Sequence, residues 1–238
     1  MDKEKDLVLV TGVARGLGKE IVISLLKDGF DVIGVDINDY SYHERIRDHQ
    51  DRFLFIKEDI TDVSGIARIK NEALKRKKTI DVLINNAGRM ISEKLGHSSI
   101  EKWHQILQLN LTAPFMLVNA FTCEMNEFAR FPLVVNVASI SGLAGGPYCA
   151  SYVCSKHGLV GLTEAINEEF RIHGRIRSVA ICSGPLDTPA QQDLGFVAGI
   201  SPRPDENLID PAMLAGLITQ TVRLRENMTV TRLVVRPR

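Results

Sequence analysis

The chain has 238 residues, and its 29 lysines and arginines balance 29 aspartates and glutamates. This balance leaves no basic face for a nucleic acid, and its four cysteines form no CxxC pair or zinc-like spacing with histidine, so we expect neither a nucleic-acid partner nor a metal site. There is no apolar leader and no run close to the ~20 apolar residues of a membrane span, so we expect a cytoplasmic protein without membrane contact.

Short apolar runs alternate with amphipathic stretches along the whole chain. The first run, at 7–10, stops at Gly12, and a pattern with helical spacing then continues to Lys27, with Gly29 as its cap. The predicted strands are 7–10, 32–35, 53–56, 80–84, 133–137, 176–182 and 230–235, and the predicted helices are 21–27, 66–74, 103–107, 115–128, 152–172 and 211–223.

Alternating strands and helices predict right-handed crossovers between parallel strands. The strands are almost continuous apolar runs, as expected when helices cover both faces of a sheet. We therefore predict an α/β fold: one Rossmann-type, doubly wound domain over residues 1–238, with a parallel sheet of about seven strands. The segment 184–210 contains four prolines and is long for a plain connection, so we interpret it as a substrate loop.

A glycine-rich turn joins the first strand to the first helix. Its sequence is Thr11-Gly12-Val13-Ala14-Arg15-Gly16-Leu17-Gly18. Glycines allow backbone N–H groups at the start of a helix to approach a pyrophosphate. We predict that five residues of this turn bind a dinucleotide cofactor: Gly12, Arg15, Gly16, Leu17 and Gly18. The turn alone is weak evidence, because many turns are rich in glycine.

Asp36 closes the second strand, roughly 20 residues further along, where the acid of a dinucleotide site stands. A carboxylate there accepts hydrogen bonds from the adenosine ribose and repels a 2′-phosphate, which favours NAD over NADP. Arg15 favours the opposite choice, because a cation in the turn can bind that phosphate. We expect NAD to be preferred. The alternative for Asp36 is a capping residue at the end of a strand.

Four polar side chains further along form a second pattern. Tyr152 and Lys156 lie one helical turn apart and share a face, and an ammonium close to a phenol lowers the pKa of the phenol. Tyr152 would then be a usable acid or base near neutral pH. Ser139 can orient a substrate oxygen against Tyr152, and Asn110 can hold a water that links Lys156 to solvent. The alternatives are a surface Tyr–Lys pair and, for Asn110, an ordinary exposed helix position.

The ordered set resembles the short-chain dehydrogenase/reductase family over essentially the whole chain. The resemblance rests on the glycine turn, the element Asn86-Ala87-Gly88, and the residues Asn110, Ser139, Tyr152 and Lys156. It implies further cofactor contacts: Asp59 and Ile60 at the adenine, Asn86, Ala87 and Gly88 along the adenosine and its ribose, Tyr152 and Lys156 at the nicotinamide ribose, and Gly184, Leu186 and Thr188 near the carboxamide.

The resemblance implies an NAD(P)-dependent oxidoreductase that transfers a hydride between a nicotinamide cofactor and a small alcohol or carbonyl substrate, with Tyr152 as acid and base. Sugars, hydroxyacids, 3-oxoacyl thioesters, steroids and small ketones all stay open as substrates. The alternative is a catalytically silent sensor or regulatory protein that binds a dinucleotide. Such proteins often lose the tyrosine or the lysine, and this chain has both.

Two positions depart from the family's pattern. Ser183 stands where the family usually has a proline before Gly184. The last predicted strand is followed by Arg236-Pro237-Arg238, where many members have a glycine-rich element. We expect the chain to form a homodimer or a homotetramer.

Overall fold

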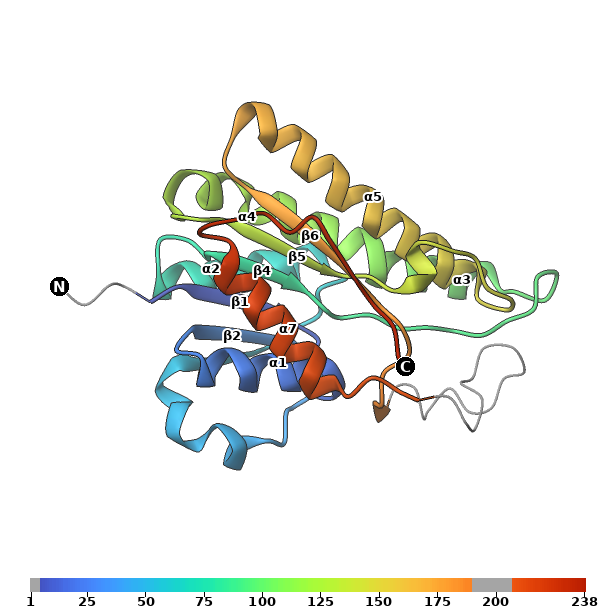
Figure 1. Cartoon of the computed structure of the whole chain (residues 1–238), viewed down its shortest axis with the longest axis horizontal. Helices are drawn as coiled ribbons and strands as arrows, with labels where there is room; N and C mark the ends of the chain where they lie inside the picture. The colour runs from blue at the N-terminus through green and yellow to red at the C-terminus, as the bar shows by residue number, and fades with distance from the viewer. Residues whose placement is uncertain (1–4, 190–206) are drawn as a thin grey trace.

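Seven parallel strands form the central sheet, in the order β3-β2-β1-β4-β5-β6-β7 (Figure 1). The computed structural model describes residues 5–189 and 207–238. The strands are β1 (Leu7–Thr11), β2 (Asp31–Asp36), β3 (Phe53–Lys57), β4 (Val82–Asn85), β5 (Leu133–Val137), β6 (Arg177–Ser183) and β7 (Arg232–Val235). All seven predicted strands are present, which confirms the doubly wound α/β fold.

Helices cover both faces of the sheet. Helices α1 and α7 pack on one face, and α2, α4 and α5 pack on the other. Successive side chains of a strand point to opposite faces, so Val8 of β1 lies in the first of these cores and Leu9 in the second. The helices are α1 (Gly16–Lys27), α2 (Val63–Arg76), α3 (Ile100–Leu107), α4 (Ala113–Phe128), α5 (Ala150–His173) and α7 (Pro211–Leu224).

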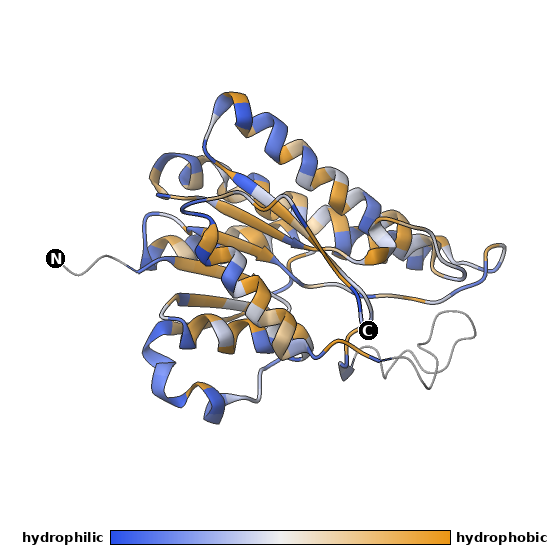
Figure 2. Cartoon of the chain, in the orientation of Figure 1, coloured by the Kyte–Doolittle hydropathy of each residue, from blue (hydrophilic) through white to orange (hydrophobic). Residues whose placement is uncertain are grey.

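Apolar residues are concentrated in the strands and on the helix faces that touch them, as Figure 2 shows. Charged and polar residues cover the outward faces of the helices. The burial of continuous apolar strands between two helical layers is the main stabilising contribution, and it is the physical reason that the alternation in the sequence produces this fold.

The observed bounds differ from the sequence prediction where apolar periodicity is missing. Helix α1 begins at Gly16, before the predicted start. Its first turn is rich in glycine, so it lacks the apolar periodicity from which the start was predicted. A 3-10 helix at His43–Arg52 is absent from the sequence prediction, since Ile46 is its one buried residue. The predicted substrate loop is described at 184–189 and 207–210, and its residues 190–206 lie outside the described part of the chain.

Within the described residues, one continuous helical stretch, Ile100–Phe128, is long enough and contains a window apolar enough to span a membrane. The sequence prediction contained no such stretch. Leu117, Phe121 and Met125 on this stretch are buried in the core beside the sheet. The core helix of a soluble protein satisfies the same length and composition test, so the stretch is weak evidence for a membrane span.

Phe121 and Phe128 on α4 give a matched test of this placement. Phe121 is fully buried, so Phe121→Ala is expected to lower the free energy of unfolding by about 3–5 kcal/mol through lost contacts and a cavity. Phe128 is 48% exposed, and Phe128→Ala should cost less than about 1 kcal/mol. Urea unfolding followed by circular dichroism measures both values. Equal losses in the two variants would contradict the packing of α4 described above.

Candidate active site

A cleft of about 1670 Å³ opens at the carboxyl ends of the strands. Strands β2 and β4 flank β1 on opposite sides, which creates the switch point where doubly wound sheets bind ligands. Asn110 does not line the cleft, whereas the other predicted site residues do: Gly12, Arg15, Gly16, Leu17, Gly18, Asp36, Asp59, Ile60, Asn86, Ala87, Gly88, Ser139, Tyr152, Lys156, Gly184, Leu186 and Thr188.

Two close contacts require glycine in the turn after β1. Gly12 has a φ of 71°, in the left-handed region, and a Cβ there would lie 2.7 Å from the Cα of Ala87. A Cβ on Gly18 would lie 2.0 Å from the carbonyl oxygen of Gly12. A side chain at either position would force the turn apart from its neighbours. Arg15, the N-cap residue of α1, makes no side-chain capping hydrogen bond, so the first N–H groups of α1 suit an anion.

Thr11 and Asn86 hold the turn against the segment that follows β4. The side-chain amide of Asn86 donates to the carbonyl oxygens of Thr11 and Gly12, at 2.9 and 3.0 Å. The hydroxyl oxygen of Thr11 accepts hydrogen bonds from the backbone N–H groups of Asn86 and Ala87, both at 3.1 Å. The amide of Asn86 therefore stabilises the shape of the cleft through main-chain contacts.

The carboxylate of Asp36 is held by two backbone groups. Its Oδ2 accepts from the N–H of Ala14 and its Oδ1 from the N–H of Asn38, each at 2.9 Å. Asp36 therefore ties the end of β2 to the glycine turn, which is the capping contact that the sequence offered as an alternative. Oδ1 also accepts from the side-chain amide of Asn38 at 3.4 Å. Oδ2 can accept a second hydrogen bond, so the same group can also receive a ribose hydroxyl.

Helix α5 presents Tyr152 to Ser139, which follows β5. A side-chain hydrogen bond joins Ser139 to Tyr152, and Ser139 Oγ also accepts from the N–H of Ser141 at 3.1 Å. Burial raises the pKa of Tyr152, and the hydrogen bond from Ser139 offsets only part of that shift. Tyr152 is therefore a neutral phenol at neutral pH in this arrangement.

Lys156 lies beside Tyr152 but bonds to the backbone. Its Nζ donates to the carbonyl oxygen of Val137 at 2.7 Å and lies 5.7 Å from the centroid of the Tyr152 ring. Burial lowers the pKa of Lys156 to about 8. The prediction that Lys156 lowers the pKa of Tyr152 is wrong for this arrangement, because burial of the phenol is the larger effect and the ammonium bonds a carbonyl oxygen instead.

Asn110 lies in a π-helical turn, Gln108–Thr112, between α3 and α4. Its side chain is fully buried, so the alternative of an ordinary exposed position is wrong. Oδ1 accepts from the N–H of Arg89 at 2.9 Å, and Nδ2 donates to the carbonyl oxygen of Arg89 at 2.8 Å and to Ser155 Oγ at 3.1 Å. Asn110 thus joins the segment after β4 to the start of α5.

Sequence reasoning missed two residues that shape the site, Thr11 and Ser155. Ser155 Oγ donates to the carbonyl oxygen of Tyr152 at 2.7 Å while it accepts from Asn110. Both residues lie inside motifs that are visible in the sequence. Each hydroxyl accepts a hydrogen bond from a segment that is distant in the sequence. The one signal that could have suggested these two residues is that polar side chains stand at the ends of strands and helices.

Comparison with known proteins agrees with this geometry. The family model for short chain dehydrogenases matches residues 6–195. The 2-dehydro-3-deoxy-D-gluconate 5-dehydrogenase of Dickeya dadantii is 29% identical over 189 residues, which cover 79% of this chain and 74% of that protein. The structure of 4-hydroxyisoleucine dehydrogenase complexed with NADH has a TM-score of 0.81 at 25% identity and covers 98% of this chain and 97% of that chain. The structure of ElxO with NADP bound has a TM-score of 0.83 at 26% identity, with the same coverage.

This chain belongs to the short-chain dehydrogenase/reductase family, as its sequence motifs indicated. It is a short-chain NAD(P)-dependent dehydrogenase or reductase. One structural neighbour is bound to NADH and the other to NADP, so the neighbours agree on a nicotinamide cofactor and differ in its phosphate.

The buried lysine predicts a pH dependence of stability. Lys156 loses its proton near pH 8 in the folded chain and at the ordinary value of 10.5 when unfolded, so between these values the unfolded chain binds more protons. As the pH rises through this window, the free energy of unfolding of the wild type is expected to rise relative to that of Lys156→Met, by at most about 1.4 kcal/mol per pH unit. Below about pH 8 the difference should be constant. Urea unfolding at a series of pH values measures it, and parallel curves throughout would show that burial does not lower the pKa of Lys156.

Proposed function

We propose that this chain moves a hydride between NAD and a small alcohol or carbonyl substrate, with Tyr152 as proton donor and acceptor. The observation that carries the proposal is that a phenol bonded to Ser139 shares one cleft with a glycine turn built for close backbone approach. The presence of both Tyr152 and Lys156 in that cleft supports an enzyme rather than a silent sensor.

The residues of the cleft fit a dinucleotide. The first turn of α1 has no side-chain cap and suits the pyrophosphate. Asp36 has acceptor capacity for the adenosine ribose. The remaining proposed cofactor contacts all line the same cleft: Asp59 and Ile60 at the adenine, Asn86, Ala87 and Gly88 at the adenosine and its ribose, and Lys156, Gly184, Leu186 and Thr188 toward the nicotinamide.

A bound nicotinamide supplies or accepts the hydride, and the residues of the chain handle the proton. Burial keeps Tyr152 protonated at neutral pH, so its hydroxyl can donate a proton to a carbonyl oxygen of the substrate. Ser139, already bonded to Tyr152, orients that oxygen. In the reverse direction Tyr152 must first lose its proton, and the phenolate oxygen then takes the proton of the alcohol. Lys156 stabilises the phenolate when its ammonium turns from the Val137 carbonyl toward the cleft.

The position of Asn110 beside Lys156 supports a role in the same proton path. A Cβ on Gly88 would lie 3.3 Å from Asn110 Oδ1 and 3.5 Å from Lys156 Nζ, so both polar groups lie next to the same glycine. Asn110 Oδ1 bonds the N–H of Arg89 and has capacity for one more donor. A water that donates to this oxygen would link Lys156 to solvent and resupply the proton.

The preference for NAD rests on Asp36. Its carboxylate lies at the end of β2 in the cleft and would repel a 2′-phosphate at short range. Arg15 lines the same cleft and favours the phosphate. The repulsion from Asp36 acts at the ribose itself, and the two backbone hydrogen bonds hold that carboxylate in place.

The proposal has three further parts, which concern the substrate loop, the assembly and the location of the enzyme. Leu186 and Thr188 line the cleft, which supports the segment 184–210 as the substrate loop. Val234 on the edge strand β7 is 46% exposed, which supports burial of this edge in a homodimer or homotetramer. We propose that the enzyme acts in the cytoplasm on a small-molecule substrate.

Tyr152→Phe tests the chemical proposal. Loss of the hydroxyl should lower kcat by about 100-fold or more, because the variant has no proton to donate, while NADH affinity changes little. Turnover is measured with NADH on a panel of small ketones, keto acids and keto sugars, and affinity by NADH fluorescence. Tyr148→Phe is the matched control, since Tyr148 is 41% exposed and precedes α5. A wild type that binds NADH yet turns over no member of the panel would favour the sensor instead.

Cofactor choice is tested by thermal melts with NAD and NADP. The wild type should gain more stability from NAD, since a ligand that binds only the folded chain raises its melting temperature. Asp36→Asn removes the charge and should shift the preference toward NADP by about tenfold, the scale of about 1.4 kcal/mol. Asp39→Asn is the control, because the exposed Asp39 pairs with Lys57. A wild type that prefers NADP would mean that Arg15 dominates.

A further inference from the structure

The segment after β7 packs against the loop after β6. The two strands are parallel neighbours with Ser183 opposite Val235, and the N–H of Gly184 donates to the carbonyl oxygen of Val235 at 2.8 Å. Two residues further along, the ring of Pro237 lies over Gly184: a Cβ on that glycine would be 2.8 Å from Pro237 Cδ. Gly184 has no left-handed φ, so it is the contact with Pro237, not the backbone conformation, that requires glycine there.

The loop held by Pro237 reaches the glycine turn. Leu186 forms a parallel bridge with Ile209, and the N–H of Asp187 donates to the carbonyl oxygen of Ile209 at 3.0 Å. Thr188 then lies beside the turn, because a Cβ added to Gly16 would be 3.5 Å from its Cγ2. The loop Gly184–Thr188 therefore runs from the contact with Pro237 along the cleft, which Gly184, Leu186 and Thr188 all line.

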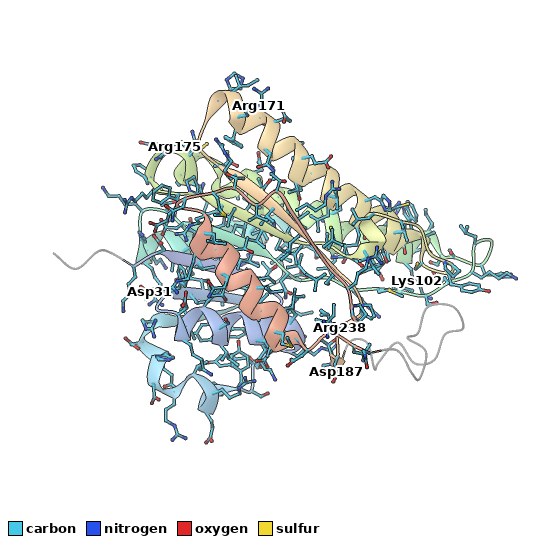
Figure 3. The ribbon with its side chains drawn as sticks, viewed as in Figure 1. Asp31, Lys102, Arg171, Arg175, Asp187 and Arg238 are labelled. Atoms are coloured by element: carbon cyan, nitrogen blue, oxygen red, sulfur yellow. The ribbon has the colours of Figure 1, made fainter. Side chains whose placement is uncertain are left out.

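The chain after β7 also touches the far side of this loop. The side-chain amide of Asn207 donates to the carbonyl oxygen of Arg238 at 3.1 Å. Figure 3 labels Arg238, whose carbonyl oxygen accepts this bond, and Asp187 on the loop. The base of the loop is thus held on both of its described ends by residues 235–238.

We propose that Pro237 is a positioning residue for the loop Gly184–Thr188. The family usually carries a proline directly before the glycine, and this chain has Ser183 there. The ring of Pro237 supplies, from a different part of the chain, a rigid surface that limits the movement of Gly184. The inference rests on the proposed function, in which this loop contacts the nicotinamide half of the cofactor.

The exposure of residues 236–238 indicates that the contact between Pro237 and Gly184 contributes more to ligand binding than to global stability. Arg236 and Arg238 are exposed and Pro237 is only partly buried, so little apolar area is removed from water. Gly184 and Thr188, by contrast, are buried. Removing the ring should therefore loosen the loop without unfolding the sheet.

Pro237→Ala, compared with wild type for two ligands, tests the proposal. NADH contains the nicotinamide, and ADP-ribose lacks it but shares the adenosine and pyrophosphate. We expect Pro237→Ala to weaken NADH binding by about fivefold, the scale of one hydrogen bond, and ADP-ribose binding by less than about twofold. NADH fluorescence and calorimetry measure the two dissociation constants. Pro132→Ala, at the opposite end of the sheet beside β5, and Arg236→Ala are the controls, with both affinities unchanged.

A double-mutant cycle tests the contact itself. Gly184→Ala alone should weaken NADH binding, because its Cβ collides with the proline ring. In the Pro237→Ala background the Cδ is gone and the nearest remaining atom, Val235 O, is at an ordinary 3.6 Å, so the added methyl should cost less. The two effects are expected to be non-additive.

The outcomes separate this inference from the proposed function. Unchanged NADH affinity in Pro237→Ala, an equal loss for ADP-ribose, or an additive cycle would each overturn the positioning role while the wild type still binds NADH. A wild type that binds neither ligand would refute the proposed function and the inference together.

Discussion

The close approach of the turn after β1 to the segment after β4 is the contact on which the cleft depends. A Cβ on Gly12 would collide with Ala87, and the hydroxyl of Thr11 and the amide of Asn86 bond the same two segments together. Strands β1 and β4 are neighbours, and the chain leaves them toward opposite sides of the sheet. Fixing these two strand ends therefore fixes the floor of the cleft, the start of α1 and the position of Asp36 at once.

Burial shifts the pKa values of Tyr152 and Lys156 in opposite directions. It raises the pKa of Tyr152 and lowers that of Lys156, so both groups are pushed toward their neutral forms in the same cleft. The ammonium is held by the Val137 carbonyl, and the phenol by Ser139. Whatever changes the solvation of the cleft therefore changes the pKa values of both groups.

Two departures from the family's pattern are neighbours in space. Ser183 in place of proline and the Arg236-Pro237-Arg238 segment lie more than fifty positions apart in the chain. The parallel pairing of β6 with β7 puts Ser183 opposite Val235, and Pro237 then lies over Gly184. Parallel pairing accounts for this, because two strands that run the same way bring the segments after them to the same edge of the sheet.

The sequence by itself determined the fold class, the seven strands and the family, because apolar runs bounded by glycine and aspartate carry that information locally. It also determined which residues line the cleft, with Asn110 as the exception. The tertiary structure decided how they are used: burial reverses the expected pKa shift of Tyr152, and the π-helical turn buries Asn110. The hydroxyls of Thr11 and Ser155 accept hydrogen bonds from other segments, Thr11 from the backbone of Asn86 and Ser155 from the side chain of Asn110. Such effects depend on desolvation and on contacts between distant segments, and neither is written in local residue patterns.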